Sequence, residues 1–335
     1  MLIALFLPCS GLLNAQGLKF NSDGQFKVLQ FTDLHFVSDK PQEAAKTFSR
    51  MDYIVGAESP DYIAVTGDVI YGMQPSADML KAVLDKLDSY GIPFCIVFGN
   101  HDAEQDLSRP EMSAMIASSK YSLNKLNDDG ELADIKLGVA SSDGTSARVL
   151  DIFMLDSHDY SKYKEVGGYA WFTSDQIQWL RSECEASAGL CGREVPSVSF
   201  FHIPLPEFYN AWVLAQEKKH NGVIGVRGEY GGHPHINSGM FAAMLESGSM
   251  MGVFCGHDHD SDYIVPHYGI ALAYGRYSGD DTVYNHLAHG TRVILFDEAE
   301  LKAGERTFRT WIHEDDGRIQ HKVKFKDGKL ETGAF

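Results

Sequence analysis

Pairs of side chains that bind metal ions follow two apolar runs of this sequence. Asp33 and His35 come after the first run, and His257 and His259 come after a later one. Side chains two residues apart in extended backbone point to the same side, so we expect the members of each pair to face one site. Imidazole and carboxylate ligands together suit zinc, manganese, iron or nickel, whereas calcium prefers oxygen ligands. These residues therefore predict metal chemistry.

Further polar side chains follow two other apolar runs. Asp68 comes directly after Gly67, and the stretch Asn100, His101 and Asp102 follows another run. Each signal is weak by itself, because an isolated histidine is more often structural, but their order at the ends of apolar runs is specific. The candidate donors outnumber the ligands of one tetrahedral ion, and a carboxylate has two oxygens. We therefore predict two ions that share Asp68.

The apolar runs that carry these donors have the length of buried strands. Near the N-terminus they are residues 26–32, 62–66 and 93–98, separated by amphipathic stretches at 42–56 and 77–90. This β-α-β-α-β alternation predicts a sheet that is at least partly parallel, with helices on its faces. Parallel strands place their carboxyl ends at one edge, so the donors that follow them are expected to converge.

The second half of the chain predicts more strands and helices. The further strand-like runs are 149–155, 197–201, 251–255, 263–265, 270–274 and 292–296. Helices are expected at 174–186 and 238–246, and the alternation of apolar and polar residues over 306–326 indicates an antiparallel hairpin. Because no repeat, low-complexity tract or Pro-rich linker divides the chain, residues 17–335 are predicted to form a single domain with two packed sheets.

The composition and net charge of the chain limit which classes of molecule it could bind. The 335 residues are 44% hydrophobic and 22% charged, which is typical of a soluble globular protein. A formal net charge of −17 argues against nucleic acid as a general partner, because phosphate backbones repel an acidic protein. Bound divalent cations would nevertheless create a local positive site for an anionic substrate.

The N-terminal segment is apolar and uncharged. It is too short, and too broken by Pro8 and Gly11, to span a bilayer stably. We predict that residues 1–16 are a signal peptide, with Ala15 offering the small residue that cleavage requires, and that the protein is periplasmic or secreted. A buried first strand or helix is the alternative.

The cysteines predict no metal site of their own. No Cys-x-x-Cys pair is present, so a sulfur-ligated zinc site is not indicated. Export permits disulfides, and Cys184 and Cys191 stand close together near the end of a predicted helix, which makes a local bridge credible. Cys95 and Cys255 lie in apolar runs and are expected to be inert core thiols.

Together these motifs resemble the calcineurin-like metallophosphoesterase family. Its pattern is Asp-x-His, Gly-Asp, Gly-Asn-His-Asp or Glu, a lone His after a strand, and Gly-His-x-His. Every element is present in this order between Asp33 and His259, with His202 as the lone histidine after residues 197–201. The resemblance implies an α/β fold, a four-layer α/β/β/α sandwich of two mixed sheets flanked by helices. It also implies hydrolysis of a phosphate ester at two metal ions.

The resemblance also implies a role for each motif residue. The implied ligands are Asp33, His35, Asp68 and His259 for one ion, and Asp68, Asn100, His202 and His257 for the other. In such enzymes a hydroxide between the ions attacks phosphorus, and a histidine free of metal, here His101, assists the departing oxygen. Asp102 is either the carboxylate that orients His101 or a turn residue. Manganese, iron or zinc are the expected metals, and the sequence does not choose among them.

Tyr71 places the sequence nearer to one branch of this family. Gly67-Asp68-x-x-Tyr71 is similar to the motif of purple acid phosphatases, in which the tyrosine binds iron. Those enzymes generally carry a glycine where this chain has His35, so we expect Tyr71 to be a pocket-wall or core aromatic rather than a metal ligand. The chain thus resembles the purple-acid-phosphatase-like branch.

Two other segments could shape a pocket. The polar loop 227–237, with His233 and His235, could reach a substrate or be an irregular surface loop. His158 and Tyr160 follow another predicted strand, and no role follows from that position alone.

Three functions remain open at this stage. A phosphomonoesterase acting on a small-molecule or protein phosphate ester is the leading prediction. A phosphodiesterase would use the same dinuclear site, because the walls of the pocket decide between the two substrates. A binding or scaffold protein that keeps the fold without catalysis is the alternative of another class. Oligomeric state does not follow from the sequence.

Overall fold

A computed structural model describes residues 17–72, 75–218 and 222–333 of the chain. The predicted signal peptide, residues 1–16, lies outside the described residues, so export stays a prediction. Among the described residues, no helix has both the length and the apolar character needed to cross a membrane.

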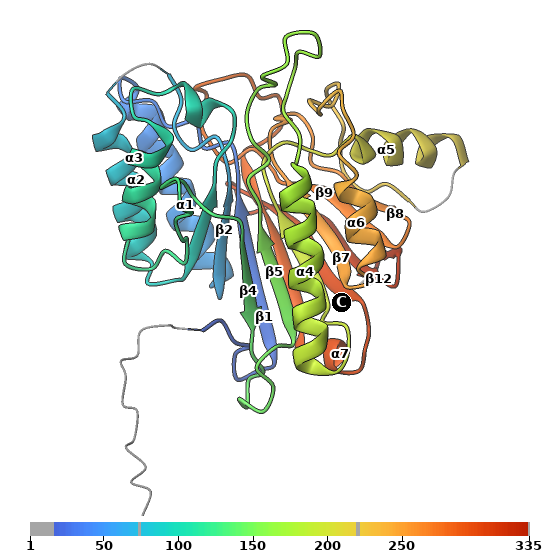
Figure 1. Cartoon of the computed structure of the whole chain (residues 1–335). Coiled ribbons are helices and arrows are strands. Elements are labelled where there is room, and N and C mark those ends of the chain that lie inside the picture. Colours follow the sequence, from blue (N-terminus) through green and yellow to red (C-terminus); the bar gives the residue numbers. More distant parts are fainter. Residues whose placement is uncertain (1–16, 73–74, 219–221, 334–335) are drawn as a thin grey trace, which may run out of the picture.

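A mixed sheet of seven strands forms one half of the structure (Figure 1). Its order is β13 (Lys329–Glu331), β12 (Ile319–Lys326), β11 (Thr307–Glu314), β10 (Gly290–Asp297), β1 (Gln25–Phe31), β2 (Tyr62–Thr66) and β3 (Phe94–Val97). The strands β1, β2 and β3 are parallel, and the other neighbours are antiparallel. Its outer face is covered by α1 (Pro41–Glu58), α2 (Ala77–Ser89) and α3 (Arg109–Ser118).

The second sheet has six strands and is also mixed. Its order is β4 (Ile135–Val139), β5 (Leu150–Met154), β6 (Ser197–Phe200), β7 (Met250–Cys255), β9 (Ile270–Tyr274) and β8 (Ile264–His267). Helices α4 (Ser174–Cys191), α5 (Pro206–Lys218) and α6 (Met240–Glu246) pack on its outer face (Figure 1). The short helix α7 (Glu298–Lys302) follows β10, and the 3₁₀ turn η1 (His101–Glu104) follows β3.

Alternating strand residues enter different cores, because both faces of each sheet are buried. In β1, Val28 packs between the two sheets, whereas Leu29 packs against the helices. In β9, Ala271 faces the first sheet and Leu272 faces the helices of the second. Burial on both faces gives four layers, so the expected sandwich of two mixed sheets with flanking helices is confirmed.

The elements that the sequence did not predict include α3, α5 and β4, besides the short α7, η1 and β13. Helix α3 buries few apolar side chains, among them Met112 and Ile116, so its pattern is weak. Helix α5 begins at Pro206, and β4 is an edge strand that contains Lys136 and Gly138. Edge strands and short amphipathic helices carry little periodic signal, which explains why these elements were missed.

The bridge between Cys184 and Cys191 that the sequence left open is not formed. Both thiols are free, and α4 continues to Cys191 instead of ending before it. Seven residues along a helix correspond to about 10 Å, whereas the Cα atoms of a disulfide lie within about 7 Å of each other. Continuation of the helix therefore excludes the bridge. Cys95 and Cys255 are buried in strands, as expected.

The absence of a bridge between Cys184 and Cys191 can be tested by alkylation. Protein that is unfolded and alkylated without reductant should carry the label on Cys184 and Cys191, because α4 keeps their sulfurs apart. Peptide mass spectrometry measures the labelling, with Cys95 as the internal standard for a buried free thiol. Recovery of a peptide in which Cys184 and Cys191 stay linked would show that α4 ends earlier than the structure indicates.

Candidate metal centre

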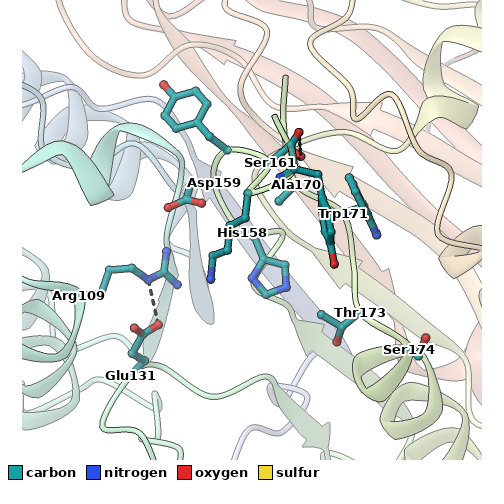
Figure 2. A pocket seen from close by; sticks show the side chains of 12 residues that line it. Arg109, Glu131, His158, Asp159, Ser161, Ala170, Trp171, Thr173 and Ser174 are labelled. Atoms are coloured by element: carbon teal, nitrogen blue, oxygen red, sulfur yellow. Dashed lines mark hydrogen bonds and ion pairs between the residues drawn. The ribbon is translucent and has the colours of Figure 1, made fainter. Parts of the chain in front are cut away.

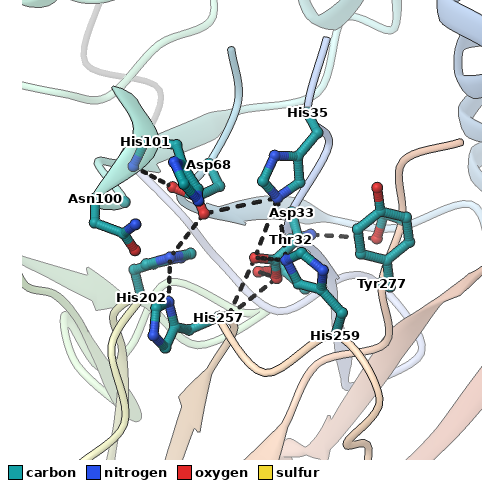
Figure 3. A network of polar contacts seen from close by, with 12 residues as sticks. Thr32, Asp33, His35, Asp68, Asn100, His101, His202, His257, His259 and Tyr277 are labelled. Carbon is teal, nitrogen blue, oxygen red and sulfur yellow. Dashed lines mark hydrogen bonds and ion pairs between the residues drawn. The ribbon is translucent and has the colours of Figure 1, made fainter. Parts of the chain in front are cut away.

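Strands of both sheets end at one edge of the molecule, and the metal-binding side chains follow them (Figure 3). Asp33 and His35 follow β1, and Asp68 follows β2. The second sheet contributes His202 after β6 and the pair His257 and His259 after β7. The seven side chains are buried and at most 9% exposed; they are Asp33, His35, Asp68, Asn100, His202, His257 and His259.

These side chains form two groups that share one carboxylate. Donor atoms of Asp33, His35, Asp68 and His259 all lie within 4.8 Å of one another, and the same holds for Asp68, His202 and His257. Asp68 Oδ2 lies 3.6 Å from His35 Nε2 and 3.2 Å from His202 Nε2. The two aspartates and four histidines that were expected to converge thus do so, with Asp68 between the groups. Asn100 lies beside the second group (Figure 3).

The backbone at these residues is not extended, contrary to expectation. Asp33, His35, Asp68 and His257 have φ angles of 52°, 45°, 50° and 77°. This left-handed region is uncommon for residues other than glycine, and strain of this kind concentrates at functional sites. Simple alternation was therefore the wrong reason for pairing Asp33 with His35. Likewise, His257 and His259 belong to different groups.

Two motif glycines allow the close approach of neighbouring loops. A Cβ atom on Gly67, whose φ is +85°, would lie 2.6 Å from both Gly99 N and His202 Nδ1. A Cβ atom on Gly99 would lie 2.2 Å from Asp68 Oδ1. Only glycine tolerates these positions, so the glycines set where Asp68 lies.

Hydrogen bonds leave lone pairs of the histidines directed into the centre. His202 Nδ1 lies 2.7 Å from the carbonyl oxygen of Thr66, and His259 Nδ1 lies 2.8 Å from that of Tyr284. A carbonyl only accepts, so each Nδ1 donates and the Nε2 of the neutral ring keeps a lone pair. His35 Nε2 faces His259 Nε2 at 3.2 Å, an arrangement suited to joint coordination of a cation.

Two buried oxygens support the same interpretation. Asp68 Oδ2 and Asn100 Oδ1 have no hydrogen-bond partner among the described residues. Asn100 Nδ2 donates to Tyr160 Oη at 3.0 Å, which turns Asn100 Oδ1 the other way as a free acceptor. Buried oxygens without a donor are costly, so a cation that accepts them as ligands would stabilise the site. The donor set therefore fits two metal ions.

The electrostatics of the centre favour positive charge. Burial raises the pKa of Asp33, but the hydrogen bond to His35 and the charges of His202 and His259 lower it to about 2. Burial likewise opposes ionisation of Asp68, yet His202 holds the pKa of this carboxyl below its usual value. Burial lowers the pKa of His202, but the Asp68 carboxylate raises it to about 10, so a cation that binds His202 Nε2 would displace a proton. Two ionised carboxylates thus supply the negative charge that attracts cations.

His101 lies beside the centre, and Glu104 is its carboxylate partner. His101 Nδ1 is 2.6 Å from Glu104 Oε2, in the turn η1. The proposal that Asp102 orients the His101 ring is corrected by the structure. Asp102 Oδ1 accepts from the N–H groups of Val69 and Ile70, and Oδ2 accepts from Gly99. Asp102 is thus a turn residue, the alternative role, and its carboxylate connects the loops that follow β2 and β3. The i, i+3 spacing of His101 and Glu104 was the signal that could have revealed the pair.

Tyr71 packs against the centre as an aromatic wall. Its ring centroid lies 5.3 Å from that of His35 and 5.0 Å from that of His101, edge-on in both cases. These contacts agree with the expected pocket-lining position.

The loop 227–237 reaches the centre through its backbone. Gly232 N donates to Asp258 Oδ1 at 2.8 Å, and Tyr274 Oη donates to Asp258 Oδ2 at 2.6 Å. Asp258, between the two histidines of its motif, was not predicted to have this role. His233 Nδ1 contacts its neighbour Pro234, and His235 Nδ1 lies 2.9 Å from the carbonyl oxygen of Val166, so both imidazoles contact loops rather than the metal-binding side chains.

The sequence matches a known family over most of its length. The model of the family described as calcineurin-like phosphoesterase matches residues 26–261. This chain belongs to that family. Its matched region contains every side chain of the two donor groups.

Relatives place this calcineurin-like phosphoesterase near the purple acid phosphatases, as expected. It is 30% identical to a protein of Arabidopsis thaliana named "Probable inactive purple acid phosphatase 14", over 89% of this chain and 83% of that protein. It is also 30% identical to phosphatase DCR2 of Saccharomyces cerevisiae, over 89% of this chain and 55% of that protein. A dimetal phosphatase structure from Danio rerio aligns with a TM-score of 0.61 and 12% identity, covering 90% of this chain and 98% of that one. At that identity the structural likeness shows the fold alone.

The close contact at Gly99 predicts a large effect of a small substitution. Gly99→Ala should lower the stability by about 1–3 kcal/mol and reduce metal content, because the new methyl group displaces Asp68. Thermal unfolding and elemental analysis measure the two effects.

Gly189→Ala is the matched control. A Cβ atom at Gly189, within α4, would meet nothing within 4 Å, and alanine should stabilise the helix by about 0.5–1 kcal/mol. Wild-type stability and full metal content in Gly99→Ala would refute the role assigned to this contact.

Proposed function

We propose that this calcineurin-like phosphoesterase hydrolyses phosphate esters, with phosphomonoesters as the favoured substrates. The observation that carries the proposal is the shared position of Asp68 between two donor groups, with His101, which belongs to neither group, beside them. The backbone N–H of His101 donates to Asp68 Oδ1 at 2.9 Å, which fixes the position of His101 relative to the two donor groups.

The donor groups define where the ions would be held. One would be held by Asp33, His35, Asp68 and His259, and the other by Asp68, Asn100, His202 and His257. When bound, such ions neutralise phosphoryl oxygens and activate water for attack on phosphorus. Manganese, iron or zinc fits these ligands.

His101 is placed to handle the proton of the leaving group. Its Nδ1 is bound to the Glu104 carboxylate, an acceptor, so the proton there stays on Nδ1 and Nε2 remains the atom for exchange. The side chain is 28% exposed, so a substrate could reach it. A protonated Nε2 would donate to the ester oxygen as the bond to phosphorus breaks.

Two substitutions separate metal binding from proton transfer. Asp68→Ala should lose metal and activity together, because both donor groups use this carboxylate. His101→Ala should keep its metal while kcat falls about a hundredfold or more, the usual contribution of a general acid. Elemental analysis and steady-state kinetics with phenyl phosphate measure both.

The same experiment distinguishes the alternative functions. A diester, bis(para-nitrophenyl) phosphate, cleaved faster than the monoester would favour the phosphodiesterase. Metal retention by the wild type without turnover of either ester would favour a binding or scaffold protein. Equal activity in Asp68→Ala and His101→Ala would contradict the assigned roles.

Substitution of Glu104 is predicted to lower kcat in a way that depends on the leaving group. Glu104→Gln should retain metal but lower kcat on phenyl phosphate by about 10–100-fold, the range seen when a supporting carboxylate is removed. The loss should be smaller for para-nitrophenyl phosphate, because its leaving group departs readily without a proton. Steady-state kinetics on the two esters measure the difference.

Asp102→Asn is the comparison variant. An amide cannot accept from three backbone N–H groups as the carboxylate does, so this variant should mainly lose thermal stability. The opposite pattern, with Asp102→Asn sensitive to the leaving group and Glu104→Gln merely unstable, would reverse our assignment.

A further inference from the structure

A cavity of about 460 Å³ lies beside the candidate metal centre. It is formed largely by the segment 158–174 between β5 and α4, with Arg109 and Glu131 on the opposite side (Figure 2). Aromatic rings of Tyr160, Tyr163 and Trp171 line it. This volume suits a small organic group.

Tyr160 belongs to both the cavity and the metal centre. Its ring lines the cavity, while its hydroxyl accepts from Asn100 Nδ2 at 3.0 Å and donates to Glu104 Oε1 at 2.8 Å. Its ring also stacks on Tyr169 with centroids 5.8 Å apart, and Tyr169 stands edge-on to His257 at 4.5 Å. Successive contacts between aromatic rings therefore connect the cavity to His257 of the metal centre.

The cavity aromatics have no evident part in folding. Tyr160 is 41% exposed and Tyr163 is 61% exposed, and neither belongs to the three hydrophobic cores. The rings of Tyr163 and Trp171 stack in parallel, with centroids 5.7 Å apart and an interplanar angle of 18°. Exposed, pre-stacked rings offer a flat apolar face to a further ring at little entropic cost.

Charged side chains of both signs line the cavity, among them Asp159 and Lys162. Arg109 is neutralised by Glu131 and Asp156. Lys162 lines the cavity and forms no ion pair with any described residue.

We propose that this cavity binds an aromatic ring in the ester group of the substrate while the phosphate lies at the metal centre. The proposal rests on the proposed function and specifies its substrate class as phosphomonoesters that carry an aromatic ring. Such a ring is either bonded directly to the ester oxygen, as in an aryl phosphate, or borne by a nucleoside. Tyr163 and Trp171 supply the stacking face, and Tyr160 joins the cavity to the metal centre.

Kinetics with three monoesters test the proposal. Wild-type protein loaded with metal is compared with Trp171→Ala and Tyr163→Ala on phenyl phosphate, adenosine monophosphate and methyl phosphate. We expect KM to rise about tenfold in the variants for an aromatic ester, since stacking of one ring is worth about a factor of ten. KM for methyl phosphate should stay unchanged. A loss confined to phenyl phosphate assigns an aryl ester, and one confined to adenosine monophosphate assigns a nucleotide.

Tyr268→Ala is the matched control for loss of an exposed ring. Tyr268 is 69% exposed in the turn between β8 and β9. This turn lies at the amino end of β9, whereas the metal-binding residues follow the carboxyl end of the parallel strand β7. Its removal should leave KM unchanged for all three esters. Equal changes in KM for methyl and aromatic esters in Trp171→Ala and Tyr163→Ala would overturn the proposal.

Binding without turnover separates this inference from the proposed function. Calorimetry compares phenylphosphonate with methylphosphonate on the metal-loaded wild type and on Trp171→Ala. If the wild type hydrolyses no ester yet prefers phenylphosphonate, and Trp171→Ala abolishes the preference, the cavity is assigned correctly and only the catalytic function fails. Equal affinity of the wild type for the two phosphonates refutes the aromatic site whether or not esters are hydrolysed.

Discussion

The buried carboxylate of Asp68 is the constraint on which the rest of the site depends. A charge in the interior is strongly unfavourable unless other groups compensate it. One oxygen of Asp68 accepts the backbone N–H of His101, and the other lies between two histidines from different groups. Gly67 and Gly99 allow the backbone to come close enough for this arrangement. The shared carboxylate thus requires both the glycines and the histidines of the motifs.

The centre also joins the two sheets. His202, which follows a strand of the second sheet, is bound through Nδ1 to the carbonyl of Thr66 in the first. In return, His257 N donates to the carboxylate of Asp33, which follows β1. These contacts span the inter-sheet core at the edge where the strands end. Because His202 and Asp33 are each held by a segment of the opposite sheet, the centre depends on the packing of the two sheets and not on any single loop.

Much of the framework could be predicted because buried strands are marked by short apolar runs. The strands β1, β2, β6, β7 and β9 were expected within one or two residues of their bounds. Edge strand β4 and helix α3 were not, since elements that are partly exposed or weakly amphipathic carry no clear period. The sequence left a bridge between Cys184 and Cys191 open because helix termini are poorly marked, and the continuation of α4 to Cys191 excludes it.

By itself, the sequence determined which donor types occur, their order, and their positions after buried strands, because these are local properties of composition and periodicity. Only the tertiary structure decided that Glu104 rather than Asp102 contacts His101, that Asp33 and Asp68 adopt left-handed backbone, and that Tyr160 links the centre to a cavity. Asp102 is held by the backbone of Val69 and Ile70, and Tyr160 contacts Asn100, so these arrangements depend on segments far apart in the chain. Backbone turns and packing set such contacts, and neither leaves a periodic pattern in the sequence.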